Sequence, residues 1–144
     1  TLDADLTFPP EYLKDLYAAA VARRADLASG SPFLRAGDLK DVAWVRRLPS
    51  LMLNALYRGL FGCALSAYTP VFRLYRTSFL KGLRLTSDGF GINAEIAARA
   101  MLAGRPVVEV PAPLIARTAG LSKLQRGREL RRHIALILRL LAGQ

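Results

Sequence analysis

Two carboxylates near the start of the chain have the spacing of a metal-binding pair. Asp3 and Asp5 lie within residues 1–7, which the sequence predicts to be a short strand. Residues two apart on an extended backbone share one face, and two like charges there need a cation between them. Carboxylate oxygens of this kind suit Mg or Mn holding a diphosphate. Taken alone, however, an Asp-x-Asp pair favours the simpler interpretation of a strand end followed by a helix cap.

A basic segment near the other end of the chain has the composition of a phosphate-binding loop. Residues 117–123 contain Arg117, Gly120, Ser122 and Lys123. Phosphate in proteins is usually held by fixed cations, hydroxyl groups and the exposed N–H groups of a glycine-containing loop. The two segments together therefore point to chemistry on a diphosphate.

Four segments resemble a known family in their order and spacing. Residues 3–11, 72–73, 89–95 and 117–123 resemble the family 2 glycosyltransferases of the dolichol-phosphate mannose synthase type, which use polyprenyl phosphates as acceptors. The resemblance runs through nearly all of the chain and covers the later part of that family's catalytic domain. It implies an α/β fold, the later part of a glycosyltransferase A-type (Rossmann-like) fold with a C-terminal amphipathic helix.

The resemblance also implies an activity. A metal-dependent hexosyltransferase would move a sugar from a nucleotide-sugar to a polyprenyl (dolichyl or undecaprenyl) phosphate, with Mg or Mn as cofactor. The protein would be cytoplasmic and peripheral on the inner face of the membrane, and it would not bind nucleic acid. Because the family's nucleotide-base half would precede Thr1, we expect residues 1–144 alone to show neither sugar transfer nor tight nucleotide binding.

Particular residues receive roles from the same resemblance. The metal ligands it implies are Asp3, Asp5 and Thr7, the last at a position where relatives commonly have Gln. The donor phosphates would be bound by Arg117, Ser122 and Lys123. The acceptor phosphate would be bound by Arg46 and Ser50. The residues expected to act in catalysis are Asp5, Arg73 and Glu95.

Two departures from the family pattern concern the acceptor side. The family often has Arg directly after a Gly-Ser pair, where this chain has Pro32, and Ala67 replaces an Asp that precedes the Phe72-Arg73 pair. A base at that position is not strictly required, because a phosphate monoester with a second pKa of about 6 is largely dianionic near neutral pH. The acceptor is therefore already a nucleophile.

Some of these residues also have purely structural interpretations. Arg46 and Arg47 would ordinarily be solvated loop charges. Glu95, in the first turn of a predicted helix, would be a partner of the helix dipole. Phe72 and Tyr75 would be core residues.

The charge of the chain is concentrated at its C-terminal end. The formal net charge is +10, and residues 117–144 hold seven of the 21 basic residues but one of the 11 acidic ones. A basic end beside apolar residues predicts an anionic surface as partner, either membrane or nucleic acid. No apolar run approaches the ~20 residues of a membrane span. With one cysteine and one histidine, the chain can form neither an intrachain disulfide nor a His/Cys metal site.

Periodicity and breakers predict the elements that would position these residues. Predicted strands cover residues 1–7, 26–29 and 107–110; predicted helices cover residues 10–24, 50–61, 77–83, 92–103 and 124–141. The succession of strand, helix and strand favours a parallel sheet, and Pro49 is expected to open the second helix. The first helix should bury one face, made of Leu13, Leu16, Tyr17, Ala20 and Val21. We divide the chain into a partial catalytic domain, residues 1–123, and a basic C-terminal helix, residues 124–144.

The C-terminal helix can pack in two ways, and the sequence also leaves two other functions open. Its apolar row, Leu130, Ile134, Ile137, Leu138 and Leu141, would lie in the headgroup plane of a membrane or dock against the domain's own core. A nucleic-acid-binding module is the alternative suggested by the charge, although the chain has no recognisable helix-turn-helix. An inactive fragment of a glycosyltransferase is the third hypothesis.

Overall fold

A small mixed sheet forms the centre of the protein. The computed structural model describes residues 1–4, 6–35, 38, 44–115 and 126–143. Strand β1 (Leu27–Ser31) lies between β2 (Arg73–Tyr75) and β3 (Val107–Pro111), and it pairs antiparallel with β2 and parallel with β3. The α/β class is confirmed, whereas the all-parallel sheet is wrong. Although a helix lies between β1 and β2 in the chain, β2 runs antiparallel to β1.

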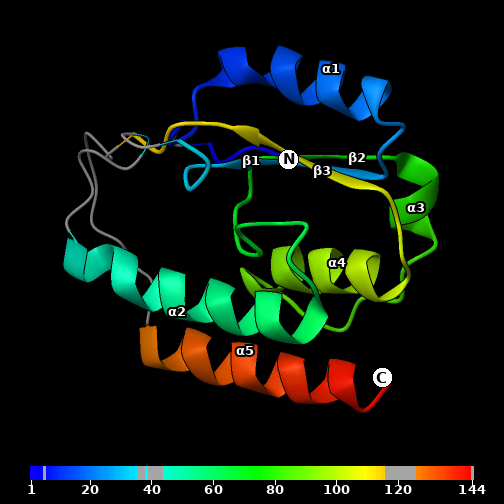
Figure 1. Ribbon diagram of the computed structural model, residues 1–144. Helices are drawn as coiled ribbons and strands as arrows, with labels where there is room; N and C mark the ends of the chain where they lie inside the picture. Colours follow the sequence, from blue (N-terminus) through cyan, green and yellow to red (C-terminus); the bar gives the residue numbers. More distant parts are fainter. Residues whose placement is uncertain (5, 36–37, 39–43, 116–125, 144) are drawn as a thin grey trace.

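Helices cover both faces of the sheet. Helix α1 (Leu13–Ala22), preceded by the 3₁₀ turn η1 (Pro10–Tyr12), lies on one face, and α4 (Gly91–Leu102) lies on the other. Beneath α4 run α2 (Trp44–Phe61) and α5 (Arg126–Leu141), while the short α3 (Thr77–Lys81) sits at one end of the sheet (Figure 1). The fold is thus a sheet with helices packed on both of its faces (Figure 1).

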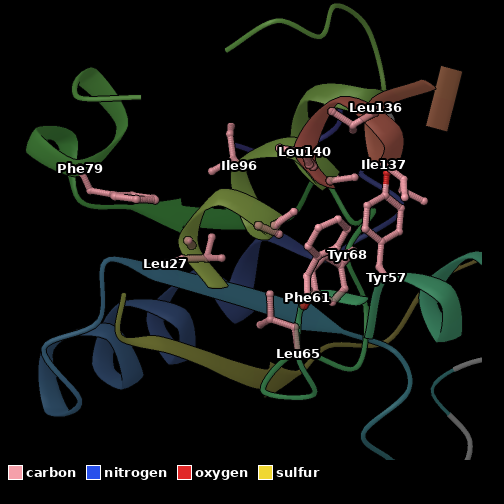
Figure 2. Packing of buried hydrophobic residues seen from close by; sticks show 14 residues of the cluster. Leu27, Tyr57, Phe61, Leu65, Tyr68, Phe79, Ile96, Leu136, Ile137 and Leu140 are labelled. Carbon is pink, nitrogen blue, oxygen red and sulfur yellow. The ribbon is translucent and has the colours of Figure 1, made fainter. Parts of the chain in front are cut away.

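The main core lies between the sheet and the three lower helices. Tyr57 of α2 stacks on Tyr68 with ring centroids 5.2 Å apart, and Figure 2 shows this pair beside Ile137 of α5. Helix α5 contributes three buried side chains to the cluster, Leu136, Ile137 and Leu140. Because these residues are shared with α2 and α4, α5 is part of the folded core.

A smaller core lies between α1 and the upper face of the sheet. Phe8 stacks on Phe72 with ring centroids 5.4 Å apart, and Leu16 is completely buried beside them. Gly30 makes this packing possible, since a Cβ atom there would come within 2.4 Å of the Phe72 ring. The predicted apolar face of the first helix is only partly buried: Leu13, Tyr17 and Val21 are exposed. A sheet of three described strands is narrow and covers one row of α1.

Several predicted boundaries are wrong. The first helix ends at Ala22 and α3 at Lys81, two residues short of each prediction. The second helix begins at Trp44, so Pro49 lies inside α2 as its sixth residue, where proline removes one helical hydrogen bond. The central strand extends to Ser31 because Gly30 pairs as a strand residue. The described residues of the stretch 1–7 do not form a strand, although Thr1 pairs with Arg73 of β2.

Candidate functional site

The first residue of the chain extends the sheet next to β2. The N-terminal amine of Thr1 donates to the Arg73 carbonyl at 2.6 Å, and the Arg73 N–H donates back to the Thr1 carbonyl at 3.0 Å. The backbone then turns, because the Leu6 N–H donates to the Asp3 carbonyl at 3.1 Å and Leu6 has a φ of +53°. Asp3 therefore opens a turn rather than lying on one face of a strand. Asp5 lies outside the described residues.

Three distant segments meet beyond the C-terminal end of β1. The Ile115 N–H donates to the Thr7 carbonyl at 2.9 Å, and the Leu114 N–H donates to the Asp38 carbonyl at 3.0 Å. Ile115 is the last described residue before the predicted phosphate-binding segment. Ile115 therefore lies beside Thr7 of the predicted metal motif, whereas Arg117, Ser122 and Lys123 lie outside the described part of the chain.

Arg73 is a buried cation that ties three parts of the fold together. Its guanidinium donates to the Ser29 hydroxyl at 3.2 Å, to the Ala67 carbonyl at 3.3 Å and to the Asn93 carbonyl at the start of α4. The side chain is fully buried, and this burial lowers the pKa of the guanidinium. Arg73 thus connects β1, the loop before β2 and α4 from inside the molecule.

Glu95 performs a similar task at the start of α4. Burial alone would raise the pKa of its carboxyl, but backbone N–H groups of Thr86 and Ser87 and the Arg99 side chain donate to the carboxylate, and the net pKa is lowered. The Arg99 ion pair is 2.8 Å long. The interpretation of Glu95 as a helix-dipole partner thus gives way to a more specific contact, because Glu95 fixes the loop that leads into α4.

The two predicted acceptor positions lie one helical turn apart on α2. Ser50 is partly exposed, and Arg46 stands four residues earlier. Positions i and i+4 share one side of a helix. The Arg46 side chain lies outside the described atoms, so its contacts are not assigned.

Sequence reasoning passed over Glu109, in the middle of β3. Its carboxylate accepts the Ser66 N–H at 2.6 Å and the Ala67 N–H at 3.1 Å, and burial raises the pKa of the group. The only sequence signal was an acidic residue inside the otherwise apolar Val107–Pro111 strand. Its partners lie 43 and 42 residues earlier, which no local pattern reveals.

The metal assignment rests on ligand type rather than on a complete cluster. Among the described residues no group of three His, Cys, Asp or Glu side chains could hold an ion, and Asp5 is not among them. Asp3 and Thr7 supply hard oxygen atoms, which fit Mg or Mn. Among the helices of the described residues, none is long and apolar enough to cross a membrane.

Comparisons with known proteins converge on one family. Residues 1–84 match the family described as Glycosyl transferase family 2. The chain is 34% identical over 126 residues to a polyprenol monophosphomannose synthase of Mycolicibacterium smegmatis, covering 85% of this chain and 47% of that protein. It is 31% identical over 129 residues to an undecaprenyl-phosphate mannosyltransferase of Micrococcus luteus, covering 88% and 52%. The chain spans about half the length of these curated relatives.

Proposed function

This chain belongs to glycosyltransferase family 2, and on that premise we propose that it takes part in moving a mannosyl group from a nucleotide-sugar to a polyprenyl phosphate. The names of the two relatives support the sugar and the class of acceptor. The nucleotide-sugar donor, the metal and the cytoplasmic face of the membrane belong to the same proposal.

One hydrogen bond carries this proposal. The Ile115 N–H donates to the Thr7 carbonyl at 2.9 Å, and Ile115 stands two residues before the proposed phosphate-binding segment while Thr7 belongs to the proposed metal motif. A nucleotide diphosphate needs cations on several of its oxygens, and a single site can supply them only if both segments meet. The contact supports one site built from residues more than 100 positions apart.

The proposed roles follow the chemistry of the side chains. Asp3, Asp5 and Thr7 would hold Mg or Mn, which when bound neutralises charge on the diphosphate leaving group. Arg117, Ser122 and Lys123 would bind the same phosphates from the other side. Preorganised charges of this kind stabilise a developing negative charge without reorganisation.

The transfer itself needs few further groups. An oxygen of the polyprenyl phosphate, gripped by Arg46 and Ser50, forms a bond to the anomeric carbon of the sugar. The bond between that carbon and the diphosphate oxygen breaks, and the nucleoside diphosphate leaves with the electron pair. Since the phosphate monoester is largely ionised near neutral pH, no proton has to be removed from it, which agrees with Ala67 in place of an acid.

Arg73 and Glu95 remain predicted catalytic residues that touch no substrate in this proposal. Both are fully buried and both hold loops in place. Their positions support an effect on catalysis exerted through those loops.

Exposed apolar residues on α2 and α5 support contact with a membrane. The two helices lie side by side at the end of the molecule opposite α1 (Figure 1), and the Tyr57 hydroxyl lies 2.9 Å from Nδ1 of His133 between them. Of the five residues in the predicted apolar row of α5, Ile137 is buried in the core. The other four are exposed: Leu130, Ile134, Leu138 and Leu141. Helix α2 exposes Leu48, Leu51, Met52, Leu56 and Leu60. With the neighbouring arginines, these side chains suit an anionic membrane surface.

The activity is tested in the complete protein with a radiolabelled nucleotide-mannose, Mn²⁺ and polyprenyl phosphate. We expect a labelled, organic-soluble polyprenyl phosphomannose, and none when the acceptor phosphate is replaced by the free alcohol. Transfer to water alone, or no transfer with guanine- and uracil-linked donors alike, would contradict the proposal.

The membrane contact is tested by sedimentation with anionic vesicles. Because α5 shares the core, deleting it would expose buried residues, so we choose the exposed pair Met52→Ser and Leu138→Ser. Binding should fall in this variant and at high salt, while the thermal midpoint stays unchanged. Equal binding of the variant and the parent protein would rule out this surface.

A further inference from the structure

The Glu109 carboxylate clamps the loop between α2 and β2. Both of its oxygens are used by consecutive backbone N–H groups, those of Ser66 and Ala67, at 2.6 and 3.1 Å. No ion pair to Glu109 is found among the described residues. A carboxylate that is half-buried and bonded to two amides holds a backbone in one geometry, and a neutral residue cannot replace both bonds.

Ser66 carries this clamp to the end of the central strand. Its hydroxyl lies 2.6 Å from the hydroxyl of Ser31, the last residue of β1, and the Ser31 oxygen accepts the Phe33 N–H at 3.2 Å. Either hydroxyl of the Ser31–Ser66 pair can donate to the other, so the clamp reaches the Ser31 turn through the Ser66 side chain while Glu109 holds the Ser66 backbone. Ser31 is completely buried, so water does not compete for its hydroxyl.

The hydrogen-bonded turn at Ser31 lies at the start of the segment that leads to the proposed acceptor-binding residues. A serine side chain that accepts the N–H two residues on fixes the local turn. From Phe33 the backbone leaves β1 and leads to α2, which carries Arg46 and Ser50. The Ser31 turn therefore fixes the point at which the chain leaves the sheet toward the helix that carries both proposed acceptor-binding residues.

We propose that Glu109 is a positioning residue of the acceptor site, which acts through Ser66 on the Ser31 turn. The proposal rests on the proposed function, because the acceptor is the polyprenyl phosphate assigned above. It differs from a purely structural role in affecting one substrate: acceptor binding should depend on Glu109 and Ser66, whereas donor binding should not.

A single thiol reports on the clamped loop without any substrate. Cys63 is the one cysteine of the chain and is exposed. It lines an open cleft of about 440 Å³ together with Ser66 and Glu109. Reaction of Cys63 with a maleimide therefore measures how firmly the loop is held.

The experiment uses the complete protein and three variants, Ser66→Ala, Glu109→Gln and Glu109→Ala, with Ser78→Ala as the control for an exposed serine on α3. KM for polyprenyl phosphate, Kd for the nucleotide-sugar and the labelling rate of Cys63 are measured for each. Ser66→Ala keeps the backbone bonds to Glu109 and should raise the acceptor KM about two- to tenfold, the effect of one neutral hydrogen bond. Glu109→Ala should raise it further and accelerate labelling. Glu109→Gln should fall between, since one amide oxygen replaces one of two acceptors.

Donor affinity should stay at the parent value in Ser66→Ala and Glu109→Gln, and Ser78→Ala should match the parent protein throughout. The proposal is overturned if acceptor and donor constants change together, or if labelling accelerates while the acceptor KM does not move. If Glu109→Ala fails to fold, Ser66→Ala decides alone. A parent protein that transfers no sugar would instead refute the proposed function, and the acceptor role with it.

Discussion

The two ends of the central strand are built in opposite ways. At the N-terminal end, the buried Asp26 forms ion pairs of 2.6 Å with both Arg76 and Arg105. At the C-terminal end, the contacts that join Thr7 to Ile115 and Asp38 to Leu114 use backbone atoms. One Asp38 carboxylate oxygen is even buried there without a hydrogen-bond partner.

This difference separates stability from function along one strand. The Asp26 carbonyl also accepts the Arg76 N–H, and the Asp26 N–H donates to the Pro106 carbonyl. Arg76 directly follows β2 and Pro106 directly precedes β3, so Asp26 joins the ends of all three strands. Its charge is neutralised within the chain. At the opposite end, the contacts between Thr7 and Ile115 and between Asp38 and Leu114 run through backbone atoms, so a side-chain substitution there leaves these bonds in place.

The largest effect is expected at the C-terminal end. Asp3→Ala or Asp5→Ala in the complete protein should lower the rate of sugar transfer by about 10²–10³-fold, as losing a group that stabilises transition-state charge does. The thermal midpoint should stay close to that of the parent protein, because Asp3 belongs to neither buried core. Normal turnover in either variant would remove the metal assignment.

The phosphate-binding segment should give the next largest effect. Arg117→Ala and Lys123→Ala should each lower kcat/KM about ten- to a hundredfold, since each removes one preorganised donor to the diphosphate. Steady-state kinetics with varied nucleotide-sugar measures this. Lys81→Ala, an exposed cation on α3, is the control. Unchanged kinetics for Arg117→Ala would show that this segment binds no phosphate.

Breaking the N-terminal end should cost stability and not activity. Asp26→Asn removes the charge that pairs with two arginines and should lower the free energy of unfolding by about 2 kcal/mol. The value stays modest because the Arg76 and Arg105 side chains are 50% and 44% exposed. Urea unfolding beside the exposed Asp88→Asn control measures it. A loss of kcat/KM in folded Asp26→Asn protein would mean that the two ends are coupled.

A smaller effect is expected in the pH dependence of stability, through the buried His133. Burial lowers the pKa of His133, although Glu129 opposes the shift. The unfolded chain then binds the proton more strongly, so the free energy of unfolding should fall as the pH drops below about 6.5 and level off below the folded pKa. His133→Gln should flatten this part of the profile without changing kcat/KM at pH 7.5. A parallel decline in both proteins would assign the acid sensitivity to other groups.

Local signals in the sequence predicted most of the helices, but not how distant segments pair. Helix α4 and strand β3 begin and end within one residue of the expected positions. The end of α4 was predictable because Gly104, just beyond it, takes a left-handed conformation with a φ of +59°. The antiparallel direction of β2 depends on its pairing with β1, and the pairing of Thr1 with Arg73 depends on a contact between residues 72 positions apart. Periodicity carries no information on such contacts.

The site shows the same limit. The spacing of Asp3 and Asp5 pointed to a metal, and the composition of residues 117–123 to phosphate. The bond between Thr7 and Ile115 could not be predicted, because it joins two backbones regardless of side chain. Glu109 was missed for the opposite reason: its side chain is informative only beside Ser66.

We expect the metal motif and the phosphate segment to form one site. A double-mutant cycle tests it, with calorimetric affinities of the nucleoside diphosphate in the presence of Mn²⁺ for the parent protein, Asp3→Asn, Lys123→Ala and the double variant. Residues that share one ligand show coupling energies of about 0.5–3 kcal/mol, whereas separate sites add within about 0.3–0.5 kcal/mol. We expect a coupling of at least about 1 kcal/mol. Strict additivity of the two substitutions would contradict the single site.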